Sequence, residues 1–507
     1  MHQRSLARPL TVLAALAIAI AARSAHADPD APVLISQPMV GESFSPGFRQ
    51  ISDFSTPYVE EEYFIQGTAD LFSYRTNPPA PQDKEEIETG VPYGTRFIVR
   101  RPADAKDFNG TLVIEWFNST VGFDTAPVWD ASAEYFDREG IAYVGFTNAN
   151  QALFYLLGGC PELGTFEPQC EGRYQPPNVF PLADDGLAYE IASQLANLLK
   201  GDAPNNPLPE DFVVERLFHA GNSQQGGSVT TYANEFHQPD LNDGYFIQVA
   251  GGGSRRLSAD SPTYPPGDPN GFAPDDLPVP VIRAQSENDV ERRALQTGDA
   301  TFTRQDDTPT FRYYELAGVA HNPVHKDIEV IAANALFPGS PAILLEDVCA
   351  LEPNTSADGP VFGSYLYNAM WENLAMQASF GIEMPSAPPL DVAGGQIARD
   401  AFGNALGGLR LPTLDVPIAT YVPINAPNPA LPPLPPPLDQ LQNLVCLLNG
   451  GVIPFDDATL AELYPNHGRY VNQIVRGSAD LRKERLLLKE DAKKLAQDAV
   501  KSDVGKQ

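Results

Sequence analysis

The feature that most constrains the fold is an alternation of short apolar strands and amphipathic helices between residues 111 and 316. Nearly continuous apolar runs at residues 111–117 (TLVIEWF) and 141–146 (IAYVGF) predict buried strands, because a strand covered on both faces does not need alternating polar residues. Residues 129–139, between these runs, have helical spacing. Strands that alternate with helices indicate βα units and a mostly parallel sheet.

The same alternation continues toward the C-terminus. Further strands are predicted at residues 212–220, 245–250, 279–284 and 311–316, and helices at residues 187–199, 228–235, 327–335 and 365–380. Before these units, residues 63–99 alternate polar and apolar side chains, which indicates antiparallel strands at an edge of the sheet. The predicted fold class is therefore α/β, with a mostly parallel central sheet flanked by helices.

The first 27 residues have the pattern of a signal peptide. Arg4 and Arg8 give a positively charged start, residues 10–22 form an apolar run, and Ala25-His26-Ala27 offers a small-x-small cleavage site. The alternative is a membrane anchor, but the apolar run is too short to span a bilayer comfortably. We expect an exported protein, periplasmic or secreted, with no stable membrane insertion.

Residues 28–507 are expected to form one domain with insertions. The 49 prolines and 40 glycines of the chain indicate long ordered loops, because apolar residues are interspersed among them. The insertions are placed at about residues 150–183 and 340–440, and a proline-rich connector at 425–438 cannot join a regular sheet. A highly charged helix at residues 479–499 is expected to close the chain.

The composition is strongly acidic, with 65 Asp and Glu against 34 Lys and Arg and a formal net charge of −31. No basic stripe is available for phosphates, so nucleic acid is excluded as a partner. The same charge disfavours anionic surfaces and strongly anionic substrates, although a local field can oppose the net charge.

Four cysteines, at Cys160, Cys170, Cys349 and Cys446, have spacings that do not fit a zinc site. Export implies an oxidising compartment, in which two disulfides are the natural interpretation. Three pairings are possible, and free buried thiols are the alternative. We favour Cys160–Cys170, because the loop between them is short and rich in Pro and Gly, which leaves Cys349–Cys446 as the second pair.

The turn Gly221-Asn222-Ser223-Gln224-Gln225-Gly226 lies between a predicted strand and a predicted helix. A sharp strand-to-helix turn holds a nucleophile in strained backbone geometry and needs small residues on both sides to avoid clashes. Gly221 meets this requirement, whereas Gln225 occupies a position that is small in the G-x-S-x-G pattern, and glycine follows one place later. Ser223 is the candidate nucleophile, and an ordinary glycine-rich turn is the alternative.

Acidic residues and a histidine follow Ser223 in the order that a serine hydrolase with this kind of turn requires. Glu287 and Asp289 come just after one predicted strand, and His321 follows the next. As general base, His321 can take the Ser223 proton and pass it to the leaving group, while the acid fixes its tautomer and stabilises the imidazolium. At this stage either carboxylate can serve as the acid.

Few other histidines compete with His321. His219 lies inside the strand before the candidate nucleophile, where a structural role is expected. His321 and His325 have i, i+4 spacing, but Pro323 breaks a helix there and no Glu follows His321. An HExxH-type zinc site is therefore not expected, and neither a metal nor any other cofactor is predicted.

Two backbone donors are expected to stabilise an oxyanion. The first is the N–H of Gln224, directly after the nucleophile, and the second comes from the loop after the central strand, at Asn118. Asn118-Ser119-Thr120 also matches a glycosylation sequon. We interpret this match as coincidental, because a glycan there would obstruct the site.

Several segments together resemble the bacterial exported α/β-hydrolase-domain protein family. They include TRFIVRRPADAKDFNGTLVIEWFNST, the GNSQQGG turn, VIRAQSENDV, YYELAGVAH and LYPNHGRYVNQI, and the resemblance covers most of the mature chain. The family turn resembles G-x-S-Q-S-G. The matching positions are Gly221, Ser223, Gln224 and Gly226, and Gln225 replaces a serine.

The resemblance implies an α/β-hydrolase fold and a serine hydrolase activity without a cofactor. It also implies that His321 is the base and that Asp289 or Glu287 is the acid. We prefer Asp289, because it lies later in the loop, where an acid at a strand end can turn toward the histidine.

The leading functional prediction is a carboxylic-ester hydrolase that forms an acyl-enzyme at Ser223 and acts on a small-molecule or polymer ester. An acyltransferase or amidase can use the same residues. A non-catalytic binding or scaffold protein is a second class, disfavoured because all three positions are intact. A calcium-stabilised binding protein is a third class, but the loop that starts at Asp240 has Gly251 where a bidentate Glu is required. The sequence does not determine the oligomeric state.

Overall fold

The computed structural model describes residues 28–38, 45–47, 49–158, 173–201, 205–322, 348–354, 363–431 and 438–506. The predicted signal peptide, the Cys160–Cys170 pair and the helix expected at residues 327–335 lie outside these residues. Within the part of the chain that is described, no helix is long and apolar enough to cross a membrane.

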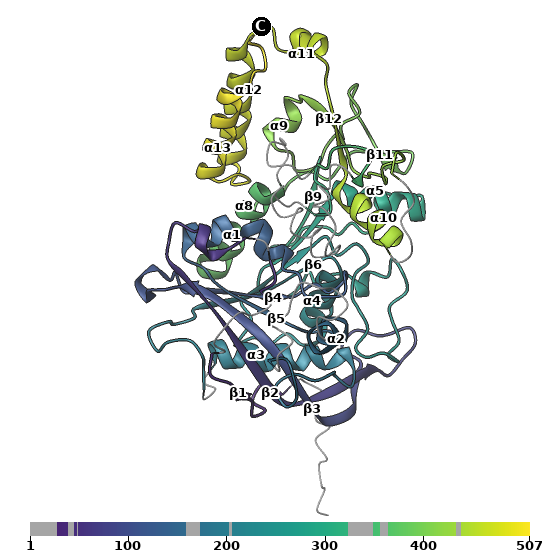
Figure 1. The fold of residues 1–507 in the computed structure, drawn as a ribbon. Coiled ribbons are helices and arrows are strands. Elements are labelled where there is room, and N and C mark those ends of the chain that lie inside the picture. Colours follow the sequence, from purple (N-terminus) through teal and green to yellow (C-terminus); the bar gives the residue numbers. More distant parts are fainter. Residues whose placement is uncertain are drawn as a thin grey trace, which may run out of the picture.

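A nine-stranded sheet in the order β1-β2-β3-β5-β4-β6-β7-β8-β9 forms the centre of the molecule (Figure 1). Its strands are β1 (Leu34–Ile35), β2 (Tyr58–Tyr74), β3 (Lys84–Pro102), β4 (Thr111–Trp116), β5 (Ala142–Phe146), β6 (Arg216–Asn222), β7 (Gly244–Gln248), β8 (Val281–Ser286) and β9 (Phe311–Leu316). Pairing is antiparallel from β1 to β5 and parallel from β5 to β9. The prediction of a mostly parallel sheet with antiparallel strands at one edge is confirmed.

The central strand β4 is largely apolar because both faces of the sheet are covered there. On β4, Leu112 and Ile114 pack into one core and Val113 packs into the core on the opposite face, as the period of two in a strand requires. Both cores exclude water, so neither face can carry a polar row. This is the physical origin of the nearly continuous apolar run TLVIEWF.

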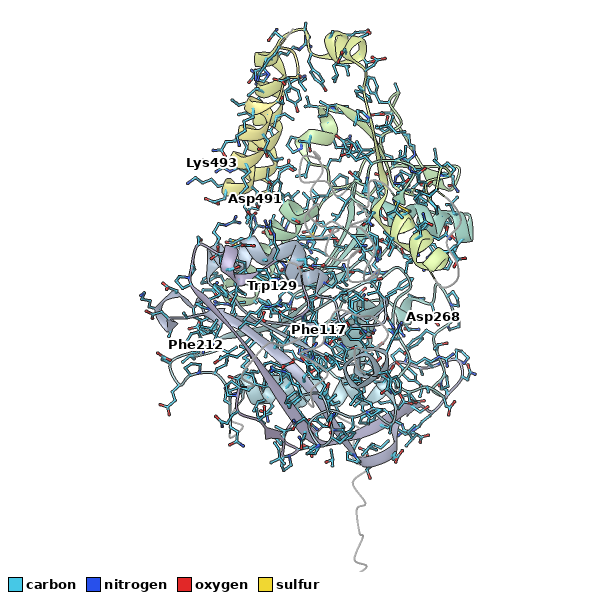
Figure 2. The ribbon with its side chains drawn as sticks, in the orientation of Figure 1. Phe117, Trp129, Phe212, Asp268, Asp491 and Lys493 are labelled. Carbon is cyan, nitrogen blue, oxygen red and sulfur yellow. A yellow bond between two sulfur atoms is a disulfide. The ribbon has the colours of Figure 1, made fainter. Side chains whose placement is uncertain are left out.

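Helices form a layer on each face. α1 (Pro127–Glu139) and α8 (Gly363–Phe380) contribute to one core, whereas α2 (Asn150–Gly158), α3 (Ala188–Lys200) and α4 (Gln224–Glu235) contribute to the other. Trp129 of α1 and Phe117, directly after β4, are fully buried in the first core (Figure 2). α5 (Glu287–Thr297) follows β8.

Shorter elements complete the C-terminal third of the described chain. They are β10 (Val392–Ala393), β11 (Gln396–Ile397), α9 (Pro412–Asp415), β12 (Ala419–Val422), α10 (Leu438–Asn449), β13 (Gly451–Pro454) and α11 (Asp457–Leu463). A disulfide joins Cys349 to Cys446 of α10 across 97 positions of sequence, so the predicted second pair is present.

The single helix predicted at residues 479–499 is wrong. The structure has two helices, α12 (His467–Lys483) and α13 (Lys489–Lys501), that pack against each other. The chain reverses at Arg485, whose φ is 61°, and Leu486 and Leu487 are buried directly after it. Burial of these leucines in the core outweighs the continuous helical pattern, because tertiary packing contributes more than propensity.

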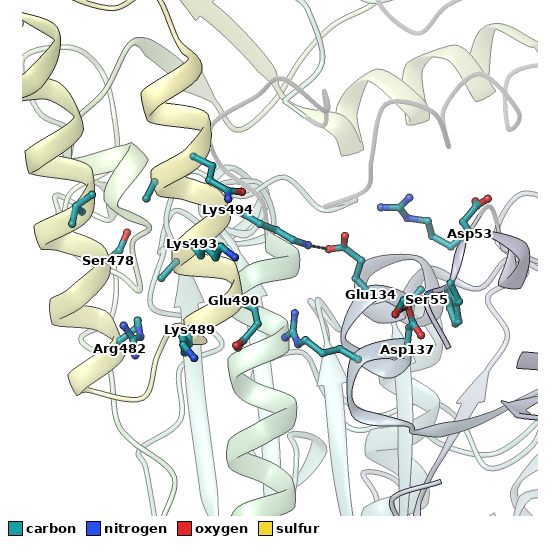
Figure 3. A pocket seen from close by; sticks show the side chains of 18 of the residues that line it. Asp53, Ser55, Glu134, Asp137, Ser478, Arg482, Lys489, Glu490, Lys493 and Lys494 are labelled. Atoms are coloured by element: carbon teal, nitrogen blue, oxygen red, sulfur yellow. Dashed lines mark hydrogen bonds and ion pairs between the residues drawn. The ribbon is translucent and has the colours of Figure 1, made fainter. Parts of the chain in front are cut away.

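The α12–α13 pair is fastened to the rest of the molecule through polar contacts with α1 and α8. Figure 3 shows the ion pair between Lys494 of α13 and Glu134 of α1. Asp491 of α13 accepts hydrogen bonds from Arg138 at 3.3 Å and from Asn368 at 3.0 Å. A cavity of about 850 Å³ lies between α1 and this pair, and no predicted site residue lines it.

Candidate active site

Ser223 occupies the sharp turn between β6 and α4. Its backbone has φ 56° and ψ −116°, a conformation that L-residues with a Cβ rarely adopt. The turn is held by a hydrogen bond from the Ser223 N–H to the carbonyl of Gln248 on the neighbouring strand, at 2.9 Å. Strain of this kind persists only where the surrounding structure enforces it, and it concentrates at functional sites.

Two glycines make this turn possible. A Cβ on Gly221 would lie 2.4 Å from the carbonyl oxygen of Gln225, and a Cβ on Gly226 would lie 2.8 Å from the carbonyl oxygen of Gln248. Both distances are far below van der Waals contact, and both involve backbone atoms. The small residue that this turn needs after the nucleophile is therefore Gly226, whereas the Gln225 side chain is accommodated in a buried position beside a separate cavity.

His321 and Asp289 are hydrogen-bonded. Nδ1 of His321 lies 2.8 Å from Oδ1 of Asp289, and both side chains are buried. The second carboxylate oxygen of Asp289 accepts a hydrogen bond from the Ser286 hydroxyl at 2.5 Å. The same hydroxyl caps α5 by accepting from the Asp289 N–H, so the helix N-terminus sets the direction of the carboxylate.

Glu287, the other candidate acid, faces different partners. One oxygen accepts from the Gly318 N–H at 2.6 Å, and the other accepts from Arg399 at 2.9 Å. Burial raises the pKa of the Glu287 carboxyl, and the Arg399 guanidinium opposes this effect. Glu287 therefore holds the backbone turn that carries His321.

Ser223, Gln224, Asp289 and His321 line one cavity of about 320 Å³. Val249, whose φ of 47° is unusual for a β-branched residue, also lines this cavity. Among the described residues, no hydrogen bond joins the Ser223 hydroxyl to His321. Such hydrogen bonds often tighten only when substrate binds.

The loop after β4 does reach the Ser223 turn, but Asn118 does not have the predicted role. Its backbone N–H donates to the carbonyl of Thr125 at 2.9 Å, and its side-chain amide donates to the carbonyl of Asn222 at 3.1 Å. The N–H of Asn118 is thus already engaged and cannot serve an oxyanion. Gln224, in contrast, is the first residue of α4, where a helix leaves its N–H groups without an intrahelical acceptor.

His219 is structural, as predicted. Its ring nitrogens face the side chains of Asn242 at 3.2 Å and Trp116 at 3.4 Å, deep in the core. Burial lowers the pKa of His219 to about 3, so the ring stays neutral at physiological pH. Within the described ranges, no group of three or more His, Cys, Asp or Glu side chains could hold a metal ion.

Three arginines that were not among the predicted site residues also line the 320 Å³ cavity, namely Arg255, Arg292 and Arg293. A signal for two of them was present. Arg292 and Arg293 follow Asp289 by three and four residues on α5, which places all three on one face of the helix.

Comparison with known proteins agrees with this architecture. The family described as "Alpha/beta hydrolase domain" matches residues 32–497. No curated protein matches the chain.

Three solved structures are among those that match the chain. "Methylesterase BT1017" is 11% identical, with a TM-score of 0.26, and the match covers 50% of this chain and 45% of that one. A putative dienelactone hydrolase from Klebsiella pneumoniae is 14% identical, with a TM-score of 0.24 and coverage of 50% and 85%. The α/β serine hydrolase XC6422 from Xanthomonas campestris is 14% identical, with a TM-score of 0.26 and coverage of 49% and 92%.

Proposed function

Since the chain belongs to the Alpha/beta hydrolase domain family, we propose that it is an exported serine hydrolase that cleaves carboxylic esters through an acyl-enzyme on Ser223. The observation that carries the proposal is the 2.8 Å hydrogen bond between His321 and Asp289, in the same cavity as the strained Ser223. An ordinary glycine-rich turn with no catalytic role requires neither a strained serine nor a histidine paired with a carboxylate.

In the proposed reaction, Nε2 of His321 removes the proton of the Ser223 hydroxyl as Oγ attacks the ester carbonyl. Asp289 keeps the Nδ1–H tautomer of His321 and stabilises the imidazolium. The N–H of Gln224, at the N-terminus of α4, donates to the oxyanion, where the helix dipole also favours negative charge. His321 then protonates the leaving alcohol, and water releases the acid by the reverse sequence of proton transfers.

Export is supported by two independent features. The first 27 residues have the sequence pattern of a cleavable signal peptide. The Cys349–Cys446 disulfide belongs to an oxidising compartment, because cytosolic thiols are kept reduced. We propose a periplasmic or secreted location on these grounds.

The direct test is release of p-nitrophenol from its acetate, butyrate and octanoate esters by the purified protein, beside Ser223→Ala. We expect the variant to lose more than about a thousandfold of the activity with unchanged folding. Ser228→Ala is the matched control. Ser228 lies on α4, which begins directly after Ser223, but it does not line the Ser223 cavity, so this variant should retain activity.

A fluorophosphonate probe separates the remaining outcomes. Labelling of the wild type but not of Ser223→Ala, without ester turnover, would place the chemistry at Ser223 and point to another acyl substrate. Absence of both turnover and labelling would refute the proposal and favour a binding or scaffold protein.

A further inference from the structure

The cavity around Ser223 has the opposite charge to the protein as a whole. Arg255, Arg292 and Arg293 line it, and Asp289 is the only carboxylate among its lining residues in the described part of the chain. The whole chain has a formal net charge of −31. Three cations around one carboxylate are therefore a local departure from the composition.

The single carboxylate does not neutralise these cations. Asp289 is already engaged through both oxygens, with His321 at 2.8 Å and with Ser286 at 2.5 Å. Arg292 forms an ion pair with the same Oδ1 at 3.9 Å, which is too long for a hydrogen bond. Among the described residues, the Arg292 guanidinium donates no hydrogen bond, so its N–H groups can meet a ligand in the cavity that it lines.

Arg293 is held in a defined position beside Arg292. Its Nη2 donates a hydrogen bond to the carbonyl of Gly251. A guanidinium has five N–H donors, so further donors remain for a ligand. Burial has the largest effect on the pKa of Arg293 and lowers it. The neighbouring Arg292 lowers it further, and Asp289 raises it. Both guanidinium groups belong to residues that line the same cavity.

Two glycines on the facing backbone leave room beside Arg293 for an atom at ordinary contact distance. A Cβ built on Gly252 would lie 3.6 Å from Nη2 of Arg293 and would meet no other atom within 4 Å. A Cβ on Gly251 would lie 3.9 Å from both that Nη2 and Oδ1 of Asp289. An anionic group can therefore approach Arg293 from the side of Gly252, where the Asp289 carboxylate is not within 4 Å.

We propose, on the basis of the serine hydrolase function above, that Arg292 and Arg293 form an anion subsite and that the preferred substrate is an ester carrying a carboxylate. A guanidinium matches a carboxylate through paired, charge-assisted hydrogen bonds. The net charge of the chain alone predicts the reverse, because it disfavours strongly anionic substrates. Exposed surface charges are screened beyond about 8 Å at physiological ionic strength, whereas charges inside a cavity are screened much less.

The test compares matched esters that differ only in charge. On the acyl side, the p-nitrophenyl monoester of adipic acid is compared with the same ester of adipamic acid, which replaces the carboxylate by an amide. On the alcohol side, p-acetoxybenzoate is compared with p-acetoxybenzamide. The wild type should show a kcat/KM at least about tenfold higher for the anionic member of one pair, and the difference should lie in KM. A ratio of about tenfold matches the free energy that a hydrogen bond to a charged group contributes.

Two kinds of variant assign this preference to the subsite. The double variant Arg292→Gln/Arg293→Gln should bring the anionic-to-neutral ratio to about one, with turnover of the neutral ester changed much less. Arg256→Gln removes the same charge from an exposed arginine outside the cavity and should leave the ratio unchanged. Arg293→Lys, which keeps the charge, should retain part of the preference.

An intramolecular carboxylate provides an independent check. Gly252 does not have a left-handed φ, so Gly252→Asp can place its carboxylate beside Arg293 without backbone strain. We expect this variant to lose the preference for the anionic ester, and Gly252→Asn to keep most of it.

Each negative outcome has one meaning. Ser223-dependent hydrolysis of neutral esters with no anionic preference in either pair, or a preference that survives the double arginine variant, would overturn the subsite and leave the hydrolase intact. Absence of both turnover and fluorophosphonate labelling would overturn the hydrolase. In that case calorimetric binding of adipate to the protein, against adipamide, would decide whether the anion site exists without catalysis.

Discussion

Replacing Asp289 by Asn removes the negative charge from a carboxylate that has two hydrogen-bonded partners. Oδ1 lies 2.8 Å from Nδ1 of His321, and Oδ2 accepts from the Ser286 hydroxyl at 2.5 Å. Asn is isosteric and can occupy the same rotamer, since its amide oxygen can still accept from the Ser286 hydroxyl while its amide nitrogen faces His321. The substitution therefore changes charge and proton position while it preserves packing.

Two effects lower the rate in this variant. The imidazolium that forms in the transition state loses its neighbouring charge, and an Asn amide that donates to Nδ1 stabilises the wrong tautomer of His321. Together we expect kcat to fall by about a thousand- to ten-thousandfold, or roughly 4 to 5.5 kcal/mol of barrier. The fold should be retained, because the side chain keeps its size and the Ser286 hydroxyl keeps its acceptor.

Glu287→Gln is the matched comparison, because it removes the other buried carboxylate on the same helix. Glu287 bonds to Gly318 at 2.6 Å and to Arg399 at 2.9 Å rather than to His321. Loss of the charged hydrogen bond to Arg399 should lower the free energy of unfolding by about 2 kcal/mol. The rate should fall less than about tenfold, through a looser turn before His321.

The assay measures kcat and KM for one p-nitrophenyl ester with both variants, beside urea unfolding curves. The expected result is a rate defect without a stability defect in Asp289→Asn and the reverse in Glu287→Gln. If Glu287→Gln had the larger loss of kcat, the acid would be Glu287 and the argument from the hydrogen bonds would fail.

Three further predictions concern stability. Reduction of Cys349–Cys446, which closes a loop of 97 positions, should destabilise the fold by up to about 4.7 kcal/mol in the chain-entropy treatment, and a calorimetric melting curve unaffected by full reduction would contradict this. Gly221→Ala should cost about 3 kcal/mol in chemical unfolding, because its Cβ would lie 2.4 Å from a backbone oxygen, and wild-type stability would mean that the turn is not strained. Burial raises the pKa of Glu115 to about 8 and of Glu190 to about 7, so the folded state binds protons more tightly than the unfolded chain, and stability should fall as pH rises from about 4.5 to 8. Thermal unfolding at pH 5.5 and pH 8 tests this, and a higher melting temperature at pH 8 would refute it.

Local patterns were sufficient for most of the fold and for the backbone geometry of the Ser223 turn. The runs that form β4 and β5 are largely apolar because both faces of the sheet are covered. Such a run can be recognised from a few consecutive residues of the sequence. The need for Gly221 is likewise local, since its Cβ would collide with the backbone only four residues on.

The choice of acid required the tertiary structure. Glu287 and Asp289 are two residues apart, so sequence position does not separate them, and only the packing of α5 against the turn at Gly318 decides which carboxylate meets His321. The N–H of Asn118 was likewise excluded from the oxyanion role by its partner, Thr125, on the far side of the loop.

The reversal at Arg485 and the arginines beside Ser223 also depended on the assembled fold. A continuous helical pattern could not show that Leu486 and Leu487 would be buried in the core. Net charge could not show which few charges share the cavity. The sequence by itself therefore determined the strands, the layers and the position of the candidate nucleophile, because these depend on near neighbours in the chain. Only the tertiary structure decided which distant side chains meet, because that depends on loop closure and on the direction of each side chain.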